Sequence, residues 1–130
     1  MGVHVGLDLI EVSDVEESLR VHRARYLERV YTPREVADCR RATGTVDARG
    51  LAERFAAKEA TLKALRAGER AIPWRSVEVV SDERGRLSLA LTAVAAELAQ
   101  ERGIVELALS VTKAAGNAAA IVIARDGGSG

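Results

Sequence analysis

The sequence has few of the side chains that build disulfide frameworks or thiolate and imidazole metal centres. Its single cysteine, Cys39, excludes a disulfide within the chain and a zinc site made of several cysteines. Its two histidines, His4 and His22, leave little for a histidine cluster. A single chain therefore cannot form a metal site that requires several cysteine or histidine ligands.

Long apolar runs and an excess of one charge are also missing. No stretch reaches the roughly 18 apolar residues of a membrane span, and the N-terminal residues lack the features of a signal peptide. We therefore expect a cytoplasmic protein that does not act at a membrane. Lys plus Arg and Asp plus Glu number 19 each, so the overall charge does not favour nucleic acid as a partner.

Aromatic residues make up only 3% of the chain, whereas hydrophobic residues as a whole make up 48%. This composition is typical of a folded chain whose core consists of Leu, Val, Ile and Ala. The length of 130 residues suits one domain, and no linker or internal repeat divides it. We expect a single domain over residues 1–125 and a flexible tail at 126–130.

Hydrophobic periodicity and turn signals predict an α+β fold. Alternating patterns predict strands at 3–10, 75–80, 86–91, 105–111 and 117–124. Capping signals predict one helix that begins at Ser13, with Glu16 as its capping partner, and runs into the arginine-rich stretch, and a second helix from Thr32 to about Arg41. Stop signals predict a third helix over 50–67, ended by Gly68, and a fourth over 92–102. Short turns between the later strands favour an antiparallel sheet, which would pack against the long central helix.

The helix predicted at 50–67 carries charges at the edges of its own apolar stripe. Lys58 and Glu59 fall on either side of that stripe, and Lys63 lies one turn after Glu59. A separate face holds only small side chains, namely Ala52, Ala56, Ala60 and Ala64. Such a face allows another element to approach closely, which would leave the charges partly desolvated.

Two interpretations of these charges are open. Glu59 and Lys63 can form an ion pair worth about 0.2–0.5 kcal/mol, with Lys58 reaching solvent over the edge of the core. Alternatively, Glu59 holds a divalent cation and Lys63 faces the anionic ligand of that cation. Mg²⁺ typically takes one or two carboxylates, waters and substrate phosphates. Asp8 is the candidate for the second carboxylate, unless it only faces solvent or caps the next helix.

Three segments, in order and at suitable spacing, resemble the holo-acyl-carrier-protein synthase family, the small 4′-phosphopantetheinyl transferases. They are VGLDLIEV at 5–12, YTPREVADC at 31–39 and RFAAKEATLKAL at 54–65. The RFAAKEA block is highly specific, and a later G-x-L-x-L-x-x-x-A pattern also fits. The resemblance covers about residues 3–124 and implies the fold of this family.

The resemblance implies an enzyme that transfers the 4′-phosphopantetheine arm of coenzyme A to a serine of an apo acyl carrier protein and releases 3′,5′-ADP. Asp8 and Glu59 would bind Mg²⁺ as cofactor, with coenzyme A as co-substrate. Lys63 would contact the pyrophosphate and act in catalysis with Glu59, a candidate acceptor of the serine proton. Arg54 would hold a phosphate at the nucleotide end.

The resemblance also implies partners. The carrier protein would belong to a fatty acid or polyketide synthase system. The chain would form a homotrimer with ligand clefts between neighbouring subunits.

Two positions depart from the family pattern. The penultimate strand commonly carries a histidine associated with the coenzyme A site, where this chain has Val111, which can neither donate a hydrogen bond nor titrate. Ser110, Thr112 and the nearby Lys113 would then supply polar contacts to coenzyme A. Near the start of the first helix the family often has an arginine that faces the acidic carrier, and Asp14 reverses that charge.

These departures leave two questions open. Four arginines that follow Asp14 either dock the carrier or form a solvated helix face: Arg20, Arg23, Arg25 and Arg29. The chain is either an active transferase or, as the alternative, a catalytically impaired family member that acts as a carrier-binding or structural domain.

Overall fold

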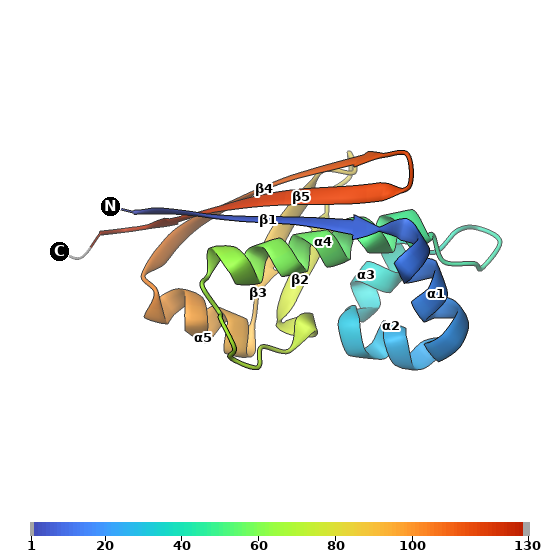
Figure 1. Ribbon diagram of the computed structural model, residues 1–130, viewed down its shortest axis with the longest axis horizontal. Helices are drawn as coiled ribbons and strands as arrows, with labels where there is room; N and C mark the ends of the chain where they lie inside the picture. The colour runs from blue at the N-terminus through green and yellow to red at the C-terminus, as the bar shows by residue number, and fades with distance from the viewer. Residues whose placement is uncertain (1, 129–130) are drawn as a thin grey trace.

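The computed structural model describes residues 2–128 and shows a three-stranded sheet lying along one long helix (Figure 1). The sheet consists of β1 (Val3–Glu11), β5 (Asn117–Asp126) and β4 (Ile104–Ala114), in this order and antiparallel throughout. The long helix α4 (Ala48–Ala64) packs against β1 and β5. The predicted α+β fold, with an antiparallel sheet on a long central helix, is confirmed.

The remaining elements surround α4 (Figure 1). Helices α1 (Val12–His22), α2 (Ala24–Val30) and α3 (Pro33–Asp38) lie at its N-terminal end, and α5 (Ala93–Glu101) lies at its other end. The short 3₁₀ helix η1 (Trp74–Ser76) leads into an antiparallel pair, β2 (Val77–Ser81) and β3 (Leu87–Leu91). Within residues 2–128, no helix is long and apolar enough to cross a membrane.

The helix starts follow the predicted caps in one case and not in another. At α3 the Thr32 side chain and Glu35 form the predicted capping box, although this helix ends at Asp38, before Arg41. At α1 the predicted box of Ser13 and Glu16 is wrong, because the helix begins at Val12 and no side chain caps it. The arginine-rich stretch forms two helices, since the chain turns at Arg23, where φ is 46°.

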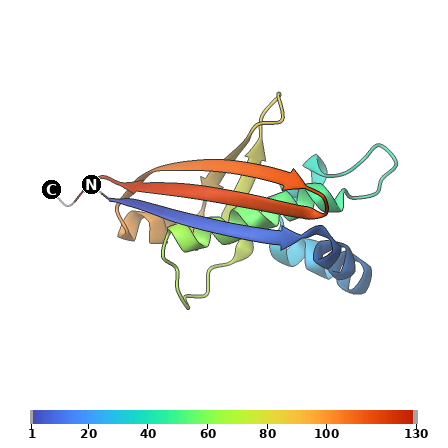
Figure 2. The same cartoon turned by 45° about the horizontal axis from the view of Figure 1, so that its top comes forward.

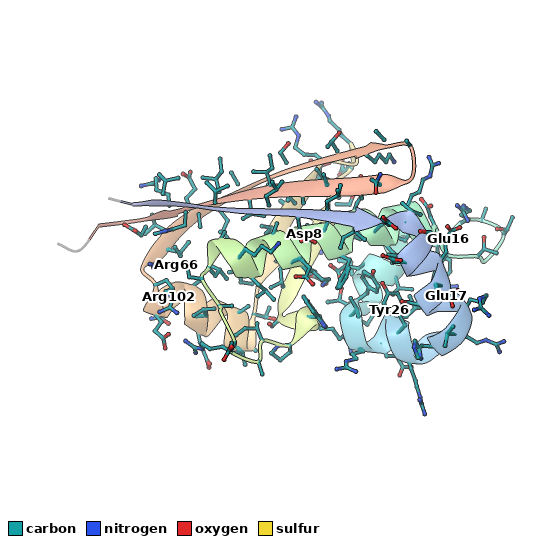
Figure 3. All side chains as sticks on the ribbon, in the orientation of Figure 1. Asp8, Glu16, Glu17, Tyr26, Arg66 and Arg102 are labelled. Atoms are coloured by element: carbon teal, nitrogen blue, oxygen red, sulfur yellow. The ribbon has the colours of Figure 1, made fainter. Side chains whose placement is uncertain are left out.

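Helix α4 ends four residues before Gly68, so the predicted stop is wrong. The chain leaves the helix at Arg66, which adopts a left-handed conformation with φ of 57°. The Arg102 guanidinium donates hydrogen bonds to the carbonyl oxygens of Leu65 and Arg66 at 3.3 and 3.2 Å. Arg102 thus provides donors for carbonyl groups that the end of a helix leaves unpaired. Figure 3 shows Arg66 and Arg102 at this end of α4.

Gly6 allows β1 to lie directly on α4. A Cβ atom at Gly6 would lie 1.8 Å from the carbonyl oxygen of Ala60, closer than any real contact permits. The alanine face of α4 is fully buried, which confirms the close approach expected at that face; its members are Ala52, Ala56, Ala60 and Ala64. The strand and the helix can therefore be in contact only because both present minimal side chains here.

Replacing Gly6 by alanine is expected to lower the free energy of unfolding by about 1–3 kcal/mol, because the added methyl group forces β1 and α4 apart. Urea denaturation measures this change. The matched control is Gly127→Ala, where the new Cβ would meet only the flexible Val105 side chain, at 3.2 Å. Equal stability of the two variants would contradict the close packing.

The apolar side chains of β1 point away from α4, and together with their neighbours they form an exposed outer face. Figure 2 shows no helix in front of this side of the sheet. The outer face consists of Val3, Val5, Leu7 and Leu9 of β1, Val105 of β4, and Ile121 and Ile123 of β5, all between 43% and 64% exposed. The small and polar residues of β1, Gly6 and Asp8, therefore lie on the side that faces α4.

Asp126, near the C-terminal end of the described residues, contacts residues near their N-terminal end. Asp126 is the last residue of β5, so the strand extends one residue into the predicted flexible tail. Its carboxylate accepts hydrogen bonds from the backbone N–H of Gly2 and contacts the His4 ring at 3.0 Å. These contacts lower the pKa of Asp126 to about 2. Residues 129–130 of the predicted tail lie outside the described part of the chain.

Candidate active site

Asp8 and Lys63 come from different elements and meet at the side of the sheet that faces α4. The Lys63 ammonium donates a hydrogen bond to Asp8 Oδ1 at 2.9 Å and another to the carbonyl oxygen of Leu7 at 3.0 Å. The Asp8 side chain is only 15% exposed, whereas that of Lys63 is 53% exposed. Figure 3 shows Asp8 on β1, over α4. The alternatives in which Asp8 only faces solvent or caps a helix are therefore wrong.

Glu59 lies one turn before Lys63 on α4. Partial burial raises the pKa of the Glu59 carboxyl, the negative charge of Asp8 raises it further, and Lys63 lowers it. Asp8 therefore lies close enough for the two carboxylates to repel each other. Among the residues that the structure describes, Glu59 has no hydrogen bond or ion pair from its side chain. The predicted Glu59–Lys63 ion pair is thus wrong, because Lys63 pairs with Asp8.

This arrangement fits a divalent cation. Asp8 and Glu59 provide two partly buried carboxylates, of which Asp8 is paired with Lys63. Within residues 2–128, no three Asp, Glu, His or Cys side chains gather in a way that could enclose a metal ion. Mg²⁺ does not require such an enclosure, because it typically binds one or two carboxylates and keeps waters and phosphate oxygens as its other ligands.

A surface cleft of about 490 Å³ opens beside these residues, and we call it the Glu59–Lys63 cleft. It is lined by Glu59, Leu62, Lys63, Ala67, Gly68, Arg70, Ala71, Ile72 and Trp74. Both residues predicted to act in catalysis therefore line one hollow. The cleft also offers apolar walls, which suits a ligand that combines charged and uncharged parts.

Lys58 is fully buried, so the prediction that it reaches solvent is wrong. Its ammonium forms an ion pair with Glu35 at 2.8 Å, and neither side chain is exposed. The same ammonium donates hydrogen bonds to the carbonyl oxygens of Trp74 and Val77, so all three of its N–H groups have acceptors. Burial lowers the pKa of Lys58, and the Glu35 charge opposes this shift.

The Lys58–Glu35 pair joins α4 to α3, to β2 and to η1, whose Trp74 lines the cleft. Glu35 also accepts hydrogen bonds from the backbone N–H groups of Thr32 and Val79, at 2.8 and 2.7 Å. The pair therefore holds α3, η1 and β2 against α4. Sequence reasoning recognised Glu35 only as part of a helix cap, and the partner that it finds in Lys58 lies 23 residues further along the chain.

The other residues predicted to bind coenzyme A lie outside this cleft. Arg54 is only 6% exposed, and its Nη1 donates to the carbonyl oxygen of Gly50, while its Nε has no partner among residues 2–128. Arg54 and Lys63 are separated by about 14 Å along the helix axis, at 1.5 Å per residue. Ser110 and Thr112 are exposed and pair across the sheet with Ile121 and Ala119. Their roles stay predictions.

Val111 packs against a buried apolar cluster of the core. It is half-buried and contacts the cluster formed by the alanines of α4 and β5 and by Val79 and Val122. The side chain that replaces the family histidine therefore contributes to the apolar core of this chain.

Comparisons with known proteins show the family of this chain. Residues 4–122 match the 4′-phosphopantetheinyl transferase superfamily. The chain is 39% identical over 123 residues to the holo-[acyl-carrier-protein] synthase of Moorella thermoacetica, covering 93% of this chain and 92% of the relative. The ACPS–CoA complex from Chronobacterium ammoniagenes is similar with a TM-score of 0.83 and 28% identity, covering 97% of this chain and 98% of that one.

A second solved structure is the acyl carrier protein synthase of Mycobacterium tuberculosis. Its TM-score is 0.72 at 32% identity, with 96% of this chain and 99% of that chain covered. The fold and these likenesses define the class as the phosphopantetheinyl transferases. Within this class, the chain belongs to the holo-[acyl-carrier-protein] synthase family.

Proposed function

We propose that this chain transfers the 4′-phosphopantetheine arm of coenzyme A to a serine of an apo acyl carrier protein, with Mg²⁺ held by Asp8 and Glu59. Phosphopantetheinyl transfer is the activity of the family to which the chain belongs. The observation that supports the metal assignment is that Glu59 and Lys63 line one cleft, while Asp8 pairs with Lys63 and its charge acts on Glu59. Coenzyme A as ligand is supported by the Chronobacterium ammoniagenes homologue, which was solved with CoA.

In the reaction, the serine oxygen forms a bond to the phosphorus that carries the phosphopantetheine arm. The bond from this phosphorus to the oxygen that remains with 3′,5′-ADP breaks, and the electron pair leaves with the nucleotide. Bound Mg²⁺ would neutralise charge on the pyrophosphate and stabilise the leaving phosphate. The Lys63 side chain is 53% exposed, so its ammonium is accessible to a pyrophosphate oxygen, for which it would exchange Asp8.

The serine must also lose its proton, and Glu59 is the group we assign to accept it. Its raised pKa makes this carboxylate a stronger base than an exposed one. The absence of another partner for Glu59 among the described side chains leaves its oxygens available for the cation and for this proton.

We further propose that the outer face of the sheet mediates a homotrimer. Soluble monomers rarely expose a contiguous apolar patch of this kind, and two further copies of the chain would cover it. Ser110 and Thr112 lie on exposed positions of β4 and would then be close to a subunit boundary. A boundary of this kind supports the expectation that the ligand cleft is shared between subunits.

Replacing Leu9 by aspartate is expected to dissociate the trimer, because it places a charge within the proposed apolar contact between subunits. Size-exclusion chromatography with light scattering measures the mass of the assembly. Ser88→Asp is the control, since Ser88 is an exposed residue of β3 away from the outer face. A wild-type protein that is monomeric at micromolar concentration would overturn the trimer.

Incubation with coenzyme A, Mg²⁺ and a panel of apo carrier proteins tests the proposed function. Intact mass spectrometry should detect the mass of one phosphopantetheine added to a carrier, and excess EDTA should prevent the addition. Absence of transfer across the whole panel would reject an active enzyme.

A catalytically impaired carrier-binding or structural domain remains the second candidate, because Val111 and Asp14 depart from the family pattern. It predicts weak or absent binding of coenzyme A in calorimetry. Micromolar binding that depends on Mg²⁺ would argue against it.

A further inference from the structure

We propose that Lys58 and Glu35 are positioning residues, which fix the place of Trp74 and thereby set the affinity of the chain for coenzyme A. The proposal rests on the function proposed above, and it gives a role in substrate binding to two side chains that no ligand can touch. Both have 0% exposure, so they act on the cleft only through the residues that they hold. Trp74 is such a residue, because it lines the Glu59–Lys63 cleft.

Trp74 is held to α4 in two ways. Its carbonyl oxygen accepts a hydrogen bond from the Lys58 ammonium at 3.1 Å. Its ring meets the ring of Phe55 at an angle of 63°, with the ring centroids 5.2 Å apart. Phe55 and Lys58 lie three residues apart on α4, so they share one face of the helix and contact η1 together. The backbone and the ring of Trp74 are thus fixed separately.

The pair also fixes the strand that follows η1. Lys58 donates a second hydrogen bond to the carbonyl oxygen of Val77, the first residue of β2. Glu35 accepts one from the backbone N–H of Val79 at 2.7 Å. The chain is therefore anchored at the start of η1 and again just after it. Loss of these anchors would let η1 move relative to α4 while both elements persist.

The place of Trp74 matters because the cleft combines two kinds of lining. Glu59 and Lys63 provide charge, whereas Leu62, Ile72 and Trp74 provide apolar surface. Coenzyme A has a charged pyrophosphate and a long uncharged arm, so it suits a cleft that combines the two. Trp74 is half-buried, which leaves part of its surface for a ligand. Apolar burial contributes in proportion to the area covered, so a displaced ring would bind the arm less well.

The positioning role depends on the hydrogen bonds of the pair and not on its charges. The double variant Lys58→Met/Glu35→Leu, which we call the pair variant, removes both charges together with the hydrogen bonds to η1 and β2. No uncompensated buried charge is left behind, unlike in a variant of Lys58 alone. The pair variant therefore separates the place of Trp74 from the stability of the fold.

The first test compares the kinetic constants of the pair variant with those of the wild type. The KM for coenzyme A is expected to rise at least about fivefold, while the KM for the carrier protein stays within about twofold. The kcat should stay close to that of the wild type, because Glu59 and Lys63 keep their places on α4. A rise in KM without a change in kcat indicates lost substrate binding. Intact mass spectrometry at varied coenzyme A concentrations measures these constants.

Val122→Ala on β5 is the matched control for lower stability. Val122 is fully buried, and its apolar cluster contains none of the described residues that line the cleft. Removing two methyl groups leaves a cavity there and destabilises the core. The KM for coenzyme A of this variant should match the wild type.

The fluorescence of Trp74, the single tryptophan, gives a second readout. Acrylamide should quench it more strongly in the pair variant than in the wild type, because the segment that carries the ring has lost its anchors. Val122→Ala should be quenched like the wild type. Equal quenching in all three proteins would show that the pair does not fix the ring.

A double-mutant cycle tests whether the pair acts through Trp74. Trp74→Leu alone should raise the KM for coenzyme A by a factor similar to that of the pair variant. Adding Trp74→Leu to the pair variant should then cause no further rise, because the ring to be positioned is already gone. Two independent disturbances would instead multiply their factors.

A second double variant, Lys58→Met/Glu35→Gln, keeps the proposal testable if the pair variant folds poorly. Glutamine retains an oxygen that can accept the backbone N–H of Val79, and the bond from Lys58 to Trp74 is still lost. The KM for coenzyme A should rise as in the pair variant.

The outcomes separate the positioning role from the proposed function. If the wild type transfers phosphopantetheine and the double variants match Val122→Ala in their KM for coenzyme A, the positioning role is overturned and the function stands. Factors that multiply in the cycle would also overturn it. If the wild type transfers to no carrier, the function is overturned and the positioning role with it. A rise confined to the KM for coenzyme A, without a further rise in the combined variant, supports the role.

Discussion

Replacing Glu59 by glutamine is expected to lower the rate of transfer at least about 100-fold while leaving the fold intact. A metal ion that stabilises a developing charge contributes several kcal/mol, and each 1.4 kcal/mol corresponds to a factor of ten in rate. Glutamine keeps the shape of the side chain but removes the negative charge that faces the cation. It also removes the proposed acceptor for the serine proton. Single-turnover mass spectrometry measures the rate, and circular dichroism checks the fold.

The matched control is Glu97→Gln on α5, where the glutamate is exposed and has no ion pair among residues 2–128. This variant should transfer at the wild-type rate. If Glu59→Gln retains more than a tenth of the wild-type rate, Glu59 is not required for the chemistry.

The same variant should also change the pH dependence of metal binding. The raised pKa of Glu59 means that protons compete with the cation at a higher pH than for an ordinary carboxyl. Mg²⁺ affinity of the wild type should therefore fall as the pH is lowered through this raised pKa. Glu59→Gln should bind Mg²⁺ weakly and without this pH-dependent step.

The second large effect is expected for Lys58→Met, which should lower the free energy of unfolding by about 3–5 kcal/mol. The substitution leaves the Glu35 carboxylate buried without its counter-charge, and an uncompensated buried charge costs this much. It also removes the donor from the carbonyl oxygens of Trp74 and Val77. Urea denaturation followed by the fluorescence of the single tryptophan measures the change.

Lys63→Met provides the comparison on the same helix. Its ion pair with Asp8 is 53% exposed on the lysine side, and exposed pairs contribute about 0–1 kcal/mol. We expect this variant to lose transfer but to keep nearly full stability. The double variant Lys58→Met/Glu35→Leu should recover part of the lost stability, because it removes both buried charges. Equal stability of Lys58→Met and Lys63→Met would contradict the buried pair.

Local signals in the sequence were enough to predict several elements of the fold. Thr32, Pro33 and Glu35 predicted the start of α3, because a capping box is formed by residues only three positions apart. The alanine face of α4 predicted a close neighbour, which is β1. The likeness of the RFAAKEA block to a family then suggested that Glu59 and Asp8 belong to one site.

Features that depend on contacts distant in sequence were not predictable from patterns. Lys58 appears at the edge of an apolar stripe, and only the folded chain shows that Glu35, Trp74 and Val77 surround its ammonium. Lys63 pairs with Asp8, 55 residues away, and not with Glu59 one turn before it. A helical pattern records which residues share a face, but not what packs against that face.

The alternation of apolar and polar residues in β1 also did not indicate which side of the strand faces the core. An alternating strand usually turns its apolar residues toward the core. Here Leu7 and Leu9 face outward and Gly6 and Asp8 face α4. The inversion has a physical reason, since only a residue without a side chain fits against Ala60. The apolar side of the strand is therefore exposed.

The most direct test of the central assignment is a calorimetric titration of coenzyme A into the wild type, Asp8→Asn and Glu59→Gln, each with and without Mg²⁺. If Asp8 and Glu59 jointly hold the cation that binds the pyrophosphate, Mg²⁺ should strengthen coenzyme A binding at least tenfold in the wild type and have little effect in either variant. Equal affinity of the wild type with and without Mg²⁺, or full Mg²⁺ dependence in both variants, would contradict the assignment.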